Sequence, residues 1–224
     1  MDTQSAELPA WRRQTRGEHR WPAALTVLAA VLLQFALPDR IEPQLGHVLA
    51  GLELALLAGL VVADPYRVTR ESTVLRRAAL TLMALVVVSN GWSAVLLIGD
   101  ILGARPVSAV GLLTAGGVVW LTNVLAIGLV HWELDRGGPA ARAAGREDHP
   151  DLLFPQMQSP ELVAPDWEPT LLDYLYLSYT NATAFSPTDV LPLSRRAKLI
   201  MAVQSAVALG VVVLVLARAV NVLS

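Results

Sequence analysis

Long, uninterrupted runs of apolar residues constrain this 224-residue chain more than any other feature. Apolar residues make up 54% of the sequence and charged residues 16%, whereas an ordinary soluble domain carries about a quarter charged residues. A run of about 20 apolar residues is long enough to cross the hydrocarbon core of a bilayer as a helix. Because backbone polar groups must be satisfied internally in lipid, the sequence predicts an all-α integral membrane protein.

Five apolar runs predict five transmembrane helices. They cover residues 21–37, 45–63, 78–98, 107–132 and 199–223. The first run is short and ends at Pro38 and Asp39. We favour an uncleaved helix over a signal peptide for this run, because its long lead-in contains acidic residues and its exit lacks a small-residue cleavage site.

Basic residues are distributed unevenly over the connecting segments. Of the 17 Lys and Arg residues, 14 lie in the tail 1–20, between the second and third runs, or between the fourth and fifth runs. Arg40, Arg105 and Arg218 are the other three. The positive-inside rule therefore places the N-terminus in the cytoplasm of a bacterial cell, with the chain crossing the inner (plasma) membrane several times.

The segment 133–169 differs in composition from the four-helix region 21–132 that precedes it. Prolines recur every four or five residues from Pro150 to Pro169. This spacing prevents a continuous helix and favours extended structure, so we expect a solvated linker.

A C-terminal module, 170–224, begins with an apolar stretch that is too short to cross the membrane. Residues 171–185 are also too apolar for a solvated loop, so they predict a re-entrant half-helix before the last transmembrane helix. Thr170 is the expected N-cap of this half-helix. Asp173 stands at the third helical position, as in a capping box.

Residues 176–198, Y-L-S-Y-T-N-A-T-A-F-S-P-T-D-V-L-P-L-S-R-R-A-K, resemble the pore loop of two-helix potassium-channel-like proteins. Tyr176 and Ser178 match the pore helix, Asp189 matches the aspartate after the filter, and Pro192 matches the lead-in to the inner helix. The resemblance implies a homo-oligomer, a tetramer by analogy, that passes monovalent cations.

The filter-like segment departs from the T-V-G-Y-G sequence of potassium channels. It consists of Thr183, Ala184, Phe185, Ser186, Pro187, Thr188 and Asp189. The two glycines that let backbone carbonyls line a pore are missing, so side-chain oxygens would have to coordinate ions. A ring of Asp189 side chains would favour cations. Potassium-channel pore loops enter from outside, whereas the charge distribution puts this segment on the cytoplasmic side.

Three segments, one of them inside 176–198, resemble a group of bacterial membrane proteins with no established activity. They are W-E-L-D-R-G-G-P at 132–139, N-A-T-A-F-S-P-T-D at 181–189 and A-R-A-V-N at 217–221. This similarity implies a family and no particular chemistry.

Four polar residues inside the expected helices are candidates for function, because such residues are expensive in a bilayer. Glu53 is a candidate proton relay or cation site. Alternatively, it is protonated, or bonded to Asn90 or Asn123. These two asparagines are expected to join helices by hydrogen bonds. Gln204 faces a pore or, alternatively, bonds to the half-helix.

The function that these features favour is passive cation conduction through residues 183–189. One alternative is a non-conducting structural or accessory membrane protein, and another is a small proton-coupled transporter that uses Glu53. The chain contains no cysteine, and its four histidines lack ligand spacing. Without a nucleophile or phosphate-loop motif, we expect no enzyme activity, metal or cofactor. A net charge of -2 gives no reason to expect nucleic-acid binding, so the expected partner is the lipid bilayer.

Overall fold

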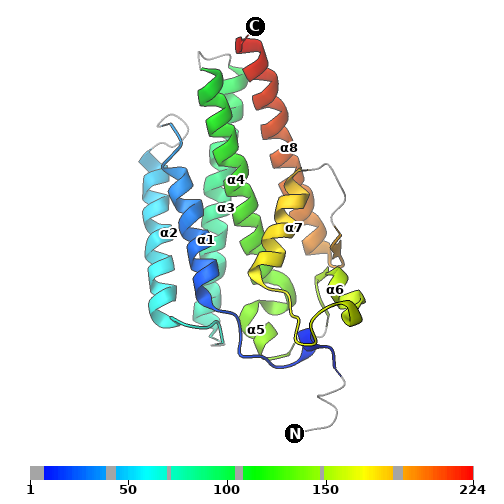
Figure 1. The fold of residues 1–224 in the computed structure, drawn as a ribbon. Coiled ribbons are helices and arrows are strands. Elements are labelled where there is room, and N and C mark those ends of the chain that lie inside the picture. The colour runs from blue at the N-terminus through cyan, green and yellow to red at the C-terminus, as the bar shows by residue number, and fades with distance from the viewer. Residues whose placement is uncertain are drawn as a thin grey trace.

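The computed structural model describes residues 8–38, 44–69, 72–103, 108–146, 149–183 and 189–223. Its long helices lie side by side with alternating directions (Figure 1). They are α1 (Arg20–Gln34), α2 (Gln44–Ala63), α3 (Thr73–Leu102), α4 (Ala109–Leu134) and α8 (Arg195–Leu223). We call the end at which α1, α3 and α8 begin the base of the bundle. The C-terminus lies at the opposite end (Figure 1).

Four of these helices are long and apolar enough to cross a membrane, which agrees with the sequence prediction of a membrane protein. The qualifying stretches are Gly46–Ala63, Thr73–Leu102, Ala109–Gly137 and Arg195–Val222. The first run differs, because α1 has only 15 residues. At 1.5 Å per residue it is about 22 Å long, against a hydrocarbon core of about 30 Å.

Two helices begin earlier than their apolar runs. We expected the third helix at 78–98, but α3 begins at Thr73, because the Ser72 hydroxyl accepts a hydrogen bond from Leu75 N at 3.5 Å. α8 begins at Arg195, where Ser194 Oγ accepts from Ala197 N at 3.1 Å. Both extensions add arginines at the base, where long basic side chains can reach the membrane interface.

The outer faces of the helices are apolar. On α8, for example, Leu209, Leu216 and Val220 are each more than half exposed. An apolar surface of this extent is rare on soluble proteins and is what a lipid-facing helix presents. Side-chain exposure therefore supports the membrane assignment independently of hydropathy.

The helix α7 (Leu171–Thr183) starts at the base and lies beside the lower halves of α4 and α8 (Figure 1). The carboxylate of Asp173 accepts from both the backbone N–H and the hydroxyl of Thr170, at 2.8 and 2.9 Å. The bond to the Thr170 N–H confirms the Asp173 half of the predicted capping box, while the Thr170 hydroxyl donates to Asp173. α7 also approaches α4 closely, because a Cβ on Gly128 would lie 2.7 Å from Leu175 Cδ2.

The proline-rich segment is not the solvated linker that we expected. It forms α5 (Pro139–Ala143), α6 (Pro155–Gln158) and the strand β1 (Leu152–Leu153), which pairs antiparallel with β2 (Leu191–Pro192). Short 3-10 turns lie at Asp135–Gly137 and Pro160–Leu162, and another, Ala10–Arg12, lies in the N-terminal segment.

Apolar side chains explain this folding of the segment. Leu152 and Phe154 are almost fully buried. The ring of Phe154 packs edge-on against Tyr174 of α7, with 5.3 Å between the ring centroids. Burying these side chains folds the segment against the base of the bundle.

Candidate functional site

Glu53 is fully buried in the middle of α2. Its carboxylate accepts a hydrogen bond from Gln34 Nε2 of α1 at 3.0 Å. The side-chain oxygen of Gln34, Oε1, accepts in turn from the Ser89 hydroxyl of α3 at 3.1 Å. The amide of Gln34 on α1 therefore links the carboxyl group on α2 to the hydroxyl group on α3. We call Gln34, Glu53 and Ser89 the amide-linked triad.

The triad corrects one detail of the sequence analysis. One alternative for Glu53 was a hydrogen bond to Asn90 or Asn123, whereas the described hydrogen bond goes to Gln34. Gln34 was overlooked because it stands near the end of the first apolar run. Asn90 is itself buried on α3, next to Ser89.

A second polar cluster lies between α4, α7 and α8. Ser178 Oγ donates to the Val124 carbonyl of α4 at 2.7 Å and accepts from Gln204 Nε2 of α8 at 2.6 Å. Asn181 Nδ2 donates to Gln204 Oε1 at 2.8 Å. Asn123 Nδ2 donates to the Gln204 carbonyl at 3.4 Å. These bonds confirm the alternative in which Gln204 joins the half-helix, and they give Asn123 its expected role between helices.

The filter-like segment is only partly visible. Ala184, Phe185, Ser186, Pro187 and Thr188 lie outside the described residues. On one side of them, the hydroxyl of Thr183 donates within its own helix to the Thr180 carbonyl at 2.8 Å. On the other side, Asp189 is exposed near β2.

A buried ionic network at the base was missed by the sequence analysis. Its centre is Arg142 of α5, which donates to Glu18 Oε1 at 2.8 Å and to the Trp132 carbonyl at 2.6 Å. Burial by itself lowers the pKa of Arg142. The acidic groups around it, Tyr174, Glu18 and Asp135, outweigh burial and hold the pKa above its ordinary value. Arg142 therefore stays charged.

Asp135, at the end of α4, extends this network. It accepts from the Tyr174 hydroxyl at 2.7 Å and from the backbone N–H of Asp151 at 2.8 Å. Asp151 forms an ion pair with Arg196 at the start of α8. Burial opposes ionisation of Asp151, but hydrogen bonds from Arg196 and Ser194 prevail and lower its pKa.

The network holds the N-terminal segment, α4, α5, α7 and α8 together. Its partners lie far apart in sequence, as in the bond of 3.0 Å between Leu171 N and Glu18, so no local motif reveals it. The one available signal was W-E-L-D-R-G-G-P, where three consecutive residues adopt positive φ: Arg136 at 49°, Gly137 at 79° and Gly138 at 94°.

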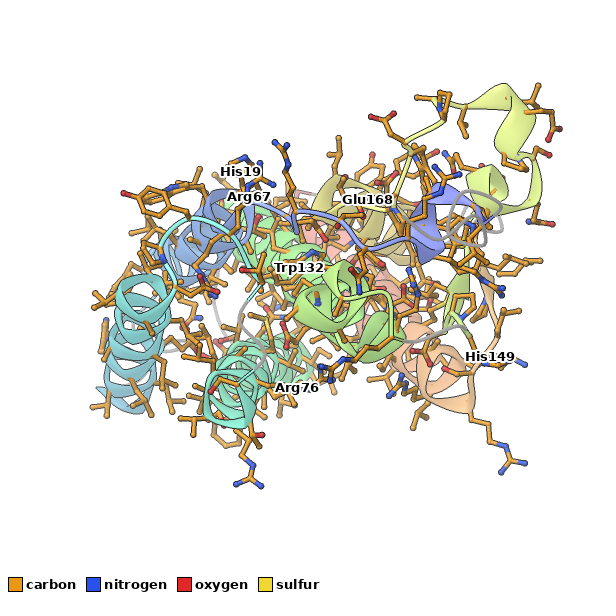
Figure 2. The ribbon with its side chains drawn as sticks, turned by 90° about the horizontal axis from the view of Figure 1, so that it is seen from below. His19, Arg67, Arg76, Trp132, His149 and Glu168 are labelled. Carbon is orange, nitrogen blue, oxygen red and sulfur yellow. The ribbon has the colours of Figure 1, made fainter. Side chains whose placement is uncertain are left out.

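A cavity of about 490 Å³ lies between α1, α2, α3 and α4 and extends to α5 at the base. Its polar lining residues are basal, and they include Arg20, Arg76 and Glu133. Seen from the base, Arg76 of α3 and Trp132 of α4 lie near α5 (Figure 2). Farther in, the walls are apolar and include Val27 and Leu57.

The cavity points toward the amide-linked triad. Glu53 stands four residues beyond Leu57 on α2, which is about 6 Å along the helix. Gln34 stands seven residues beyond Val27 on α1, which is about 10 Å. The base and the buried carboxyl are therefore separated by the cavity and one to two helical turns.

Comparisons of the chain with protein-family models, with curated proteins and with solved structures find no match. The class of the protein thus follows from its own structure: it is all-helical, with four helices able to span a membrane by length and composition. Among the described residues, no group of three or more His, Cys, Asp and Glu side chains is placed to hold a metal ion.

Proposed function

We propose that this protein is a small proton-coupled membrane transporter in which Glu53 gains and loses the coupling proton. The observation that carries the proposal is a fully buried carboxyl in the middle of α2, about one helical turn beyond a cavity of about 490 Å³. Ionisable residues inside membrane helices commonly mark ion pathways and proton relays.

The bonding of Glu53 offers a way to couple a proton to helix movement. An ionised carboxylate accepts from Gln34, whereas a protonated one also becomes a donor. Because Gln34 also bonds to Ser89, a change at Glu53 reaches three helices at once. Protonation turns an acceptor oxygen of Glu53 into a donor, so the hydrogen bonds around it must change, and this change favours a rearrangement of α1, α2 and α3.

The cavity supplies the second element that a transporter needs, a compartment for a solute. Its volume lies within the range of about 300–1,000 Å³ that is usual for ligand pockets. Its polar end is at the base and its apolar end lies toward Glu53. A solute held there would lie between the basal surface and the proton-carrying group.

Proton flux in proteoliposomes tests this function. The purified protein is reconstituted with a pH-sensitive dye inside, an acidic medium outside and mixtures of small organic solutes added in turn. We expect addition of the correct solute to acidify the lumen with the wild-type protein and not with Glu53→Gln. Glu161→Gln, the same change at an exposed residue, serves as the matched control.

Two outcomes would overturn the proposal. One is solute-dependent acidification that is equal in the wild type and Glu53→Gln. The other is the absence of acidification with any mixture while the protein is folded and correctly inserted.

A second candidate function is cation conduction by an oligomer through residues 183–189. It is supported by α7, a 13-residue helix that begins at the base, as α8 does. Asp189→Asn should then reduce cation flux into liposomes. If neither Glu53→Gln nor Asp189→Asn changes any flux, the structural or accessory alternative is favoured, and the internal bonding of Ser178 and Gln204 agrees with it.

A further inference from the structure

We infer that the basal cavity binds an amphiphile with a phosphate or carboxylate headgroup and a single apolar tail. This inference names the solute class for the proposed transport site, and for transport it rests on that proposed function. Binding itself rests on the cavity alone.

The headgroup end of the cavity is basic. Arg20, Arg76 and Arg146 line it, against one glutamate, Glu133. Arg20 is partly neutralised by an ion pair with Asp64 at 3.2 Å. Arg76 lies close enough to Glu133 to interact with its charge. The lining thus holds three guanidinium groups and one carboxylate, a composition that favours an anion.

The start of α3 adds to this preference. Ser72 and Thr73 line the cavity, so the N-terminus of a 30-residue helix opens onto it. Helix N-termini present free N–H groups and a partial positive charge to anions. Arg76, one turn farther along α3, offers planar donors that match a phosphate or carboxylate.

The opposite end of the cavity is apolar. Along α3, the lining continues from Arg76 through Ala79 and Leu82 to Met83. From Arg76 to Met83 the helix rises about 10 Å, and Val27 and Leu57 lie on the facing helices. A site that is basic at one end and apolar over this length fits a headgroup followed by a tail.

Equilibrium binding of decyl phosphate to the full chain in nanodiscs of zwitterionic lipid tests the inference. We expect saturable binding that Arg76→Gln weakens at least tenfold, because a charge-assisted bond is lost. Arg77→Gln, the adjacent exposed arginine, is the matched control and should leave affinity unchanged. Ala79→Phe fills the tail compartment and should also weaken binding.

Ligand variants keep the test decisive if a protein variant does not fold. With the wild-type protein, decyltrimethylammonium and inorganic phosphate should each bind at least tenfold more weakly than decyl phosphate. Equal binding of either one would overturn the inference, as would equal losses in Arg76→Gln and Arg77→Gln. Failure of decyl phosphate to bind would overturn it directly.

Changing the lipid composition of the nanodisc distinguishes two sources of the natural ligand, the membrane and the solution. If the ligand is a single-tailed membrane lipid, lysophosphatidylglycerol in the nanodisc will compete with decyl phosphate and lower its apparent affinity. If the ligand comes from solution, lysophosphatidylglycerol will have no effect. Binding without proton flux would refute the transport proposal alone, whereas proton flux with other solutes and no decyl phosphate binding would refute this inference alone.

Discussion

Replacing Gly138 with Ala should destabilise the protein strongly, although the change adds a single methyl group. Gly138 lies between α4 and α5 with φ 94° and ψ 174°. These backbone angles are essentially restricted to glycine, and holding another residue there costs about 1–3 kcal/mol of folding stability.

Steric contact adds to this loss. A Cβ on Gly138 would lie 2.8 Å from the Glu133 carbonyl oxygen and 2.9 Å from Arg76 Nη1. The Arg76 side chain can move, but the carbonyl belongs to the last turn of α4 and cannot move without the helix. With both effects, we expect a loss of about 2–4 kcal/mol in the free energy of unfolding.

Chemical unfolding in micelles, monitored by tryptophan fluorescence, measures this free energy. Gly117→Ala is the matched control, since nothing lies within 4 Å of its added Cβ and alanine favours a helix by up to about 1 kcal/mol. If the unfolding free energy of Gly138→Ala is within about 0.5 kcal/mol of that of the wild type, the link between this turn and stability is refuted.

Four further predictions concern α7, the basal charges and the topology. Ser178→Ala breaks bonds to α4 and α8 and should lower unfolding free energy by about 1–2 kcal/mol in the same assay; an unchanged midpoint would contradict this. The pKa of Asp151 is lowered in the folded state, so the ionised side chain stabilises the fold above its ordinary pKa of about 3.9, and this stabilisation disappears as the pH falls. In Asp151→Asn, the melting temperature should therefore fall less steeply with decreasing pH than in the wild type. Burial and the Glu18 charge raise the pKa of Glu168, so Glu168→Gln should raise the melting temperature at neutral pH, with the gain vanishing below about pH 4. Single cysteines at Asp189, near the base, and at Ser108, at the opposite end, should react with an impermeant maleimide from opposite sides of the membrane, and labelling from one side would refute the topology.

Particular helices show which parts of the fold could be predicted from the sequence. Hydropathy located α2, α4 and α8 to within a few residues, because a helix in lipid must be apolar over most of its length. The Thr170 cap was also readable, since its partner Asp173 is three residues away. The position of α3 was less well predicted, because its first turns are basic and lie outside the apolar run.

The proline-rich segment was misjudged for a related reason. Its prolines do prevent a long helix, as expected, but they say nothing about burial. Phe154 packs against Tyr174, twenty residues later, and this contact depends on how α7 returns to the base.

For the candidate site, the sequence by itself determined the membrane setting and singled out Glu53 as a costly buried carboxyl. Only the tertiary structure decided that Gln34 and Ser89 are bonded to each other beside it, that Arg142 meets Glu18, and that a cavity lies below the triad. The physical reason is that apolar length and capping are local properties of the chain. Pairing of polar groups and enclosure of a cavity depend on which helix faces meet, and the sequence does not fix those faces locally.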